Sequence, residues 1–399
     1  MESKNNWFYL ALFWLINFCL GSFYAWSVYS SWLAEYYSAI SNAVVTVSSL
    51  TFVFSVGTAC NPISMVIAGF LTDRFGPRLV LFIGGGVTAL GYFLMSISTD
   101  STLLLLGYGI CLGMGSGATV IATVTSAVKL FPKMRGLAGG SVGAFYGMGS
   151  VCLPPLANFM AENLGILTTL FYFSVACLIV IWGCAFLIRL PASRSMAARG
   201  ASGDNLDCWQ MMKTPRFYAM FVLFIVATLS PLMLFSQTVI IAQTQVGLGM
   251  SAAVLSISVL AFANTSARFV AGAISDKIGR ANTLGLAVAV VLCGLVMLVF
   301  AKEGDAFLFY AGLVCVGACF GSSVGIFPGY TAEQFGAANA SMNYGVMTLA
   351  FSISGIIGPN IVRACSEGGQ YQKAYFIAIV ISLFGLVAAF FCRRFEKRS

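Results

Sequence analysis

The chain has 399 residues, of which 59% are hydrophobic and only 9% are charged, whereas a soluble domain carries about 25% charged residues. This composition argues against a soluble enzyme and against a nucleic-acid binder, because a water-soluble fold has no use for so much apolar side chain. Twelve transmembrane helices of about 20 residues each would use about 240 residues. The net charge of +8 is typical of the cationic excess on the inner side of a membrane protein.

Charged residues mark the ends of the predicted helices. In the first half, six spans are expected between residues 4 and 35, 35 and 73, 78 and 100, 100 and 129, 135 and 162, and 162 and 189. A polar stretch from 189 to 216 predicts a loop or linker. In the second half, the uncharged run 217–267 accommodates span 7 and most of span 8, and four more spans lie between residues 280 and 302, 305 and 333, 333 and 363, and 373 and 393. The fold class expected is therefore an all-α integral membrane protein with 12 transmembrane helices.

The Lys and Arg residues between these spans predict the orientation. With the N-terminus inside, seventeen of them fall on the inner side and three on the outer side, and Arg268 is left over. Such an asymmetry places both termini in the cytoplasm. The expected location is the cell (inner) membrane, crossed many times. No cleavable signal peptide is expected, because the first apolar run is too long.

The two halves of the chain repeat each other. Gly69-Phe-Leu-Thr-Asp73-Arg74-Phe-Gly76 returns as Gly272-Ala-Ile-Ser-Asp276-Lys277-Ile-Gly279, an offset of 203 residues, and Pro155 and Pro359 lie 204 apart. This offset predicts two pseudo-symmetric six-helix bundles at 1–188 and 217–399, joined by a cytoplasmic linker at 189–216. Two such repeats are typical of a transporter with a cavity at their interface.

The repeated loop resembles the signature of the major facilitator superfamily. In both copies a turn that needs glycine carries an acidic group and cations that can pair with neighbouring helix ends. The residues expected to serve this gating role are Asp73, Arg74, Arg78, Asp276, Lys277 and Arg280.

Further motifs are similar to the oxalate/formate antiporter family, which also transports lactate-like and pyruvate-like monocarboxylates. They are Gly21-Ser-Phe-Tyr24-Ala25-Trp26, Phe131-Pro132-Lys-Met-Arg135-Gly136, Lys213-Thr214-Pro215-Arg216-Phe217 and Phe327-Pro328-Gly-Tyr-Thr331, followed by Asn343-Tyr344-Gly345. One position departs from this pattern. The oxalate exchangers carry a lysine six residues after the glycine of the last motif, where this chain has Phe351. The resemblance therefore implies a monocarboxylate-type member rather than an oxalate carrier.

Arg268 is the one basic residue inside a predicted span. It lies eight residues from Asp276, which corresponds to about 12 Å along a helix and to the middle of a core about 30 Å thick. A buried charge is costly and normally marks a substrate path, and guanidinium binds a carboxylate through a planar fork. The sequence places no Asp or Glu at that depth to pair with it, so Arg268 is the predicted carboxylate site.

Six further residues complete the predicted substrate site. Asn264 lies one helical turn before Arg268, where it can orient the guanidinium, bind substrate or bond between helices. The resemblance implies cavity positions for Tyr24, Tyr146, Thr119 and Phe320, and Phe320 with Phe351 would form an apolar wall, although each of these residues could also serve packing. Glycines four apart, at Gly113 and Gly117 and at Gly321 and Gly325, predict close helix crossings rather than a phosphate loop.

Several functions remain open at this point. The leading prediction is a secondary active or facilitative transporter of small organic anions, and the alternatives are an oxalate/formate-type anion exchanger and an exporter of other small molecules. A nutrient sensor is less favoured because no signalling domain or long tail is seen. An enzyme is not expected, because the chain has no His and the predicted spans hold no Asp or Glu at membrane depth for acid–base chemistry. No cofactor is expected, and the twelve cysteines without histidine predict no metal site. The expected partners are a small carboxylate, the lipid bilayer, and protons or a counter-anion, with the chain as a monomer.

Overall fold

The computed structural model describes residues 4–41, 44–190, 205–235, 237–365 and 371–395. Every regular element in these ranges is helical, which confirms the all-α class. Most of the predicted linker, residues 191–204, lies outside the described residues.

The helices of the first sequence half include a 3₁₀ segment, η1, and a π-helical segment, η2, each within a longer helical stretch. In chain order they are α1 (Lys4–Leu20), η1 (Gly21–Ala25), α2 (Trp26–Ser41), α3 (Val47–Phe75), α4 (Pro77–Ser96), α5 (Ser101–Leu104), η2 (Leu105–Leu112), α6 (Gly113–Leu130), α7 (Arg135–Leu164) and α8 (Ile166–Leu187).

The second half repeats this order after a short helix. Its helices are α10 (Cys208–Met212), α11 (Pro215–Phe235), α12 (Thr238–Thr244), α13 (Met250–Ile278), α14 (Arg280–Phe300), α15 (Ala306–Phe335), α16 (Ala340–Met347), α17 (Leu349–Cys365) and α18 (Gln372–Phe395).

Eleven helical stretches in the described part of the chain are long and apolar enough to cross a membrane. The twelfth expected span corresponds to α7, which has 30 residues but is not among the eleven. Six glycines and two prolines lower its mean hydropathy, although its length of about 45 Å exceeds the hydrocarbon core.

Two acidic residues that were expected to mark helix ends lie inside helices instead. Glu35 is an exposed residue of α2, and Glu162 is an exposed residue of α7. A helix that leaves the hydrocarbon core can continue into the polar headgroup region, where a charged side chain is solvated. Charge therefore marks the membrane boundary more reliably than the end of the helix.

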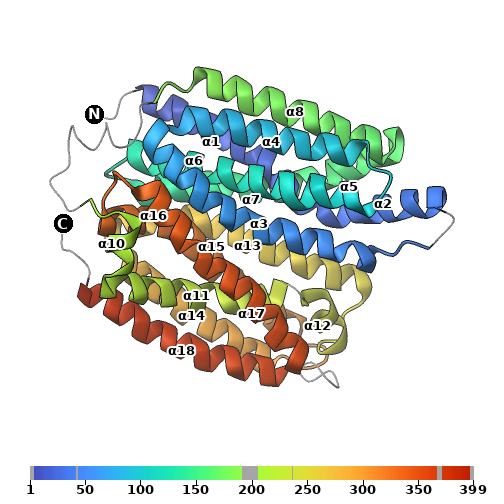
Figure 1. The fold of residues 1–399 in the computed structure, drawn as a ribbon. Coiled ribbons are helices and arrows are strands. Elements are labelled where there is room, and N and C mark those ends of the chain that lie inside the picture. Colours follow the sequence, from blue (N-terminus) through green and yellow to red (C-terminus); the bar gives the residue numbers. More distant parts are fainter. Residues whose placement is uncertain (1–3, 42–43, 191–204, 236, 366–370, 396–399) are drawn as a thin grey trace. The chain divides into compact units, whose positions relative to one another are not determined.

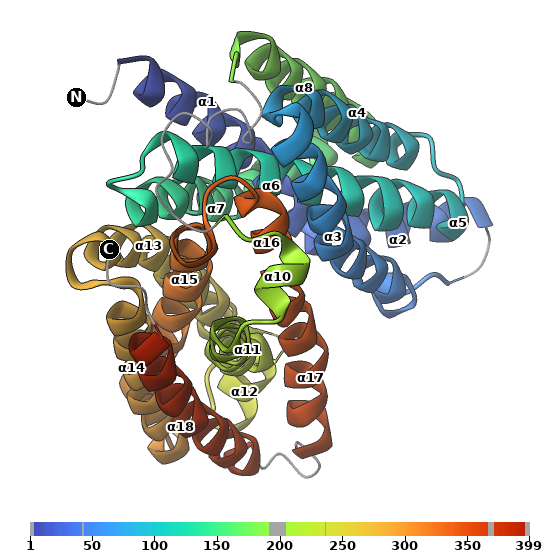
Figure 2. The same ribbon diagram turned by 60° about the vertical axis from the view of Figure 1, so that its left-hand side comes forward.

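The chain forms two compact units, and each takes segments from both sequence halves. Unit 1 comprises residues 1–131, 145–207 and 335–346, and unit 2 comprises residues 132–144, 208–334 and 347–399. In unit 1, α3 and α4 both pack on α6, and α4 packs along α8 (Figure 1). In unit 2, α11 packs on α17 and α18, and Figure 2 shows α11 almost end-on beside them.

Glycines bring helix backbones into contact in both units. In unit 1, a Cβ on Gly113 of α6 would lie 2.7 Å from the carbonyl oxygen of Gly57 in α3. In unit 2, a Cβ on Gly317 of α15 would lie 2.6 Å from the carbonyl oxygen of Leu260 in α13. Neither approach leaves room for a larger residue, and the contact at Gly113 confirms the close helix crossing predicted there.

Candidate functional site

Arg268 is a buried residue of α13 in unit 2, with 7% of its surface exposed. Its Nε donates a hydrogen bond to Oδ1 of Asn264 at 3.2 Å, one turn earlier on the same helix. A terminal nitrogen donates to the carbonyl oxygen of Gly143 in α7 at 2.9 Å. The guanidinium plane is thus fixed by two neutral oxygen atoms on two helices, and neither bond neutralises its charge.

Small residues of two neighbouring helices make room for Arg268. A Cβ on Gly325 of α15 would lie 2.8 Å from the Arg268 carbonyl oxygen. A Cβ on Gly140 of α7 would contact the same oxygen atom, and one on Gly321 would contact the Asn264 carbonyl oxygen. The glycines therefore let three helix backbones meet at the level of Arg268.

Unit 2 also contains an aromatic cluster that includes Phe320. Phe320 of α15 stacks on Phe351 of α17 with ring centroids 5.8 Å apart. Phe235, at the end of α11, contacts Phe320 with centroids 5.5 Å apart. The structure thus brings together the two phenylalanines predicted to form an apolar wall and adds a third, which the sequence analysis did not identify.

The two predicted site tyrosines of unit 1 contact each other. Tyr24 lies in η1 and is 45% exposed, and its ring meets that of Tyr146 edge to face at 5.7 Å. Tyr108, in the π-helical η2, packs against the segment that carries Tyr24. Its hydroxyl donates to the Phe23 carbonyl oxygen at 2.8 Å, and its ring lies 4.3 Å from that of Trp26. Two irregular helix segments therefore meet beside Tyr24.

Thr119 is fully buried in α6. Its hydroxyl donates to the Gly115 carbonyl oxygen of its own helix at 2.8 Å, and its Oγ1 lies 2.6 Å from the position of a Cβ on Gly84 of α4. These contacts belong to the packing of α6 against α4. A substrate role for Thr119 stays a prediction, and these contacts do not support it.

The first motif carboxylate, Asp73, caps a helix from the second sequence half. The backbone N–H groups of Ser341 and Met342, at the start of α16, donate to its two oxygen atoms at 3.3 and 2.9 Å. The Nζ of Lys129 lies 2.7 Å from Oδ1 and also donates to the Ser341 hydroxyl at 2.7 Å. Asp73 and Lys129 are both almost fully buried, so this is a buried ion pair at a helix N-terminus.

The second motif carboxylate, Asp276, forms the corresponding cap in unit 2. The N–H groups of Gly136 and Leu137, at the start of α7, donate to its oxygen atoms at 3.0 and 2.8 Å. Arg280 lies 2.6 Å from Asp276 and 2.6 Å from Glu333. One buried cation therefore connects two carboxylates in unit 2.

The other three predicted gating residues lie on exposed surfaces. Arg74 lies over the rings of Phe70 and Phe75, with centroid distances of 5.9 and 5.4 Å. Arg78 lies 5.8 Å from the centroid of Phe82, and Lys277 lies in the last turn of α13. The cation beside Asp73 is thus Lys129, from another helix. The repeat could have pointed to Lys129 as a motif residue, because Lys129 and Glu333 are 204 residues apart and occupy the same position in the two halves.

The chain matches the sequence model of the Major Facilitator Superfamily over residues 11–359. It is 30% identical over 343 residues to the MFS-type transporter YhjX of Escherichia coli (strain K12), covering 86% of this chain and 84% of the relative. It is 28% identical over 392 residues to the oxalate:formate antiporter of Oxalobacter formigenes, covering 97% of this chain and 91% of the relative. The fold is similar to that of the proton:xylose symporter XylE, with a TM-score of 0.78, 14% identity, and coverage of 100% of this chain and 97% of that chain. The chain therefore belongs to the Major Facilitator Superfamily of membrane transporters.

Proposed function

We propose that this protein transports small monocarboxylates, such as lactate, pyruvate or formate, by alternating access. The observation that carries this proposal is the burial of Arg268 in α13, where Asn264 and the Gly143 carbonyl fix its guanidinium. Burying a cation costs several kcal/mol, and proteins retain such a group in a membrane span mainly for function. A carboxylate is the ligand that a guanidinium fork recognises best.

The aromatic cluster supports a substrate with a small apolar part. Phe320 and Phe351 present stacked rings in unit 2, and a methyl group gains free energy when it leaves water for such a surface. The position of Phe351 would carry a second cation in the oxalate exchangers that the sequence resembles. With one cation, the site neutralises one carboxylate, so lactate and pyruvate fit it better than oxalate.

Tyr24 and Tyr146 are the proposed donors to the rest of the substrate. Their rings contact each other, and a phenol can donate to a second carboxylate oxygen or to a 2-hydroxyl or 2-keto group. Asn264 is proposed to act through Arg268, because its amide oxygen already accepts from the guanidinium.

An anion exchanger of the oxalate:formate type is the second candidate. The similarity to the antiporter of Oxalobacter formigenes, which extends over 97% of this chain, favours it. The two candidates differ in a measurable property, because an exchanger needs an anion on both sides of the membrane and a uniporter or proton symporter does not.

The decisive experiment measures uptake of labelled formate, lactate, pyruvate and oxalate into proteoliposomes, with and without internal anion. Arg268→Ala should abolish uptake, and Arg268→Lys should reduce it strongly because a point charge loses the bidentate geometry. Arg394→Lys, on an exposed residue at the end of α18, is the matched control and should retain uptake. Wild-type uptake by Arg268→Ala would overturn the proposal.

We also infer that residues 1–188 and 217–399 are the two repeats, that the linker 189–216 and both termini are cytoplasmic, and that the protein lies in the cell (inner) membrane. The 203-residue offset and the excess of seventeen cations over three support this topology. Thiol labelling from outside the cell at a cysteine introduced into the linker should fail, and successful labelling would contradict the topology.

A further inference from the structure

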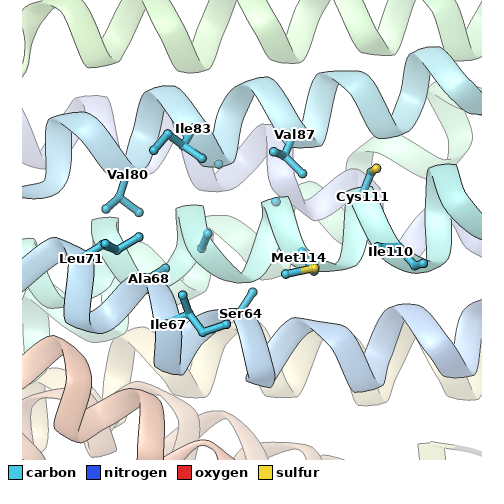
Figure 3. A pocket seen from close by; sticks show the side chains of 13 residues that line it. Ser64, Ile67, Ala68, Leu71, Val80, Ile83, Val87, Ile110, Cys111 and Met114 are labelled. Carbon is cyan, nitrogen blue, oxygen red and sulfur yellow. The ribbon is translucent and has the colours of Figure 1, made fainter.

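A pocket of about 290 Å³ opens between α3 and α4 in unit 1, with α6 as its floor. Figure 3 shows the side chains of these helices around it, with Leu71 and Val80 at one end and Ile110 and Cys111 at the other. The lining residues are almost all apolar and none is charged: Ser64, Ile67, Ala68, Leu71, Val80, Ile83, Gly84, Val87, Ile110, Cys111, Met114, Gly115 and Ala118. The hydroxyl of Ser64 donates to the carbonyl oxygen of Asn61 in its own helix. The pocket therefore suits a hydrocarbon ligand.

Backbone packing creates this space. A Cβ on Gly115 of α6 would lie 2.8 Å from the carbonyl oxygen of Gly84 in α4, so these two helices are already in contact. Helix α3 packs on the other side of α6, where a Cβ on Gly117 would contact the backbone of Asn61. The short side chains of Ala68 and Ala118 do not fill the space between α3 and α4.

The mouth of the pocket lies on a face that a membrane would cover. Ile67 and Ile83 are 53% and 51% exposed at its two sides, and the helices that carry them are long and apolar enough to span a bilayer. Apolar cavities of this kind stay free of water, and the hydrocarbon core of a bilayer contains no water that could enter the pocket. The acyl chain of a lipid is the molecule available there to fill the pocket.

An exposed cation lies just beyond one end of the pocket. Ser64, Ile67 and Leu71 line it along one face of α3, and Arg74 follows three residues after Leu71, so it continues that face. The rings of Phe70 and Phe75 support the Arg74 guanidinium in the last turn of α3. An acyl chain in the pocket would bring its phosphate to this helix end, where Arg74 can bind it as a charge-assisted hydrogen-bond donor.

We propose that unit 1 binds an anionic phospholipid, with one acyl chain in the pocket between α3, α4 and α6 and its headgroup on Arg74. The site does not depend on the transported substrate. The second copy of the motif offers a matched comparison, because Lys277 occupies the position of Arg74 and no residue of α13 lines this pocket.

The test uses native mass spectrometry of the purified full chain with phosphatidylglycerol or with phosphatidylethanolamine of the same acyl chains. Because one basic residue near the membrane surface is worth about 1 kcal/mol towards anionic lipid, wild-type protein should retain phosphatidylglycerol with about fivefold higher affinity. Arg74→Gln should remove this preference, and the control Lys277→Gln should keep it. Equal affinity of the wild type for the two lipids would overturn the proposal.

The pocket is tested separately by filling it. Ala118→Phe, on the floor, and Val87→Trp, on the α4 wall, should each lose the bound lipid while the protein remains monodisperse. Retention of phosphatidylglycerol at wild-type affinity by a folded pocket-filling variant would refute the acyl-chain site. If both variants fail to fold, the comparison of Arg74→Gln with Lys277→Gln still decides the proposal.

Discussion

The ion pair of Asp73 and Lys129 allows a quantitative prediction. Asp73→Asn keeps the shape of the side chain but removes its charge, and the buried Lys129 then loses the carboxylate of its ion pair. Removing one member of a buried pair costs about 3–5 kcal/mol. The Asn amide oxygen can still accept from Met342 N–H, which donates to Asp73 at 2.9 Å, so most of this loss is expected from the broken ion pair with Lys129.

The assay is thermal unfolding of the purified protein in detergent. A loss of about 3–5 kcal/mol should lower the melting temperature by about 6–20 °C for a unit of roughly 200 residues. The double variant Asp73→Asn with Lys129→Gln should recover part of this loss, because it leaves no buried charge. Asp100→Asn is the control. Asp100 also caps a helix, through Leu103 N–H at 2.8 Å, but it is exposed, and Asn caps a helix about as well as Asp.

Two results would refute this reasoning. If the melting temperature of Asp73→Asn lies within a degree or two of the wild-type value, the ion pair contributes less to stability than a buried pair should. If the double variant is no more stable than Asp73→Asn, the loss comes from the helix cap and not from the cation. The double-mutant cycle separates these two contributions.

Three further changes have expected outcomes. Asp276→Asn should cost less than Asp73→Asn, about 1–3 kcal/mol, because Arg280 keeps its partner Glu333, and thermal unfolding of both variants tests the order. Tyr108→Phe should leave the protein folded but raise the KM for carboxylate uptake more than it lowers the maximal rate, because the lost hydrogen bond holds the segment that carries Tyr24. Phe351→Lys should increase oxalate uptake relative to lactate uptake. The increase is at most about a thousandfold if the new ammonium lies about 4 Å from the second carboxylate at a dielectric near 20. An unchanged ratio of oxalate to lactate uptake in a counterflow assay would contradict the one-cation argument.

The sequence was sufficient to predict the helical class. Apolar runs between charges follow directly from the thickness of the bilayer, and the motif around Asp73 recurs 203 residues later at Asp276. The irregular segments could not be predicted in this way. The π-helical turn at 105–112 reads as an ordinary apolar run, because its register depends on how Tyr108 packs on Phe23 and Trp26.

The surroundings of the candidate site also depend on contacts between helices that are distant in the sequence. The predicted depth of Arg268 rests on its spacing to Asp276, but its contact with the Gly143 carbonyl depends on α7 crossing α13 at that level. The motif predicted that Asp73 would pair with a cation, and the nearest cations in sequence are Arg74 and Arg78. The partner is Lys129, because side chains of α3 at positions 73 and 74 point in different directions and Asp73 faces α6.

The two caps also show how a repeat can keep its geometry while its charges diverge. Asp73 and Asp276 each accept two backbone N–H groups from a helix of the other sequence half. Positions 129 and 333 correspond in the repeat, but one carries Lys and the other Glu. Unit 1 therefore pairs one cation with one carboxylate, whereas unit 2 places Arg280 between two. The energetic cost of breaking each cap should differ, because Arg280 keeps its ion pair with Glu333 when Asp276 is lost, whereas the loss of Asp73 breaks the ion pair of Lys129.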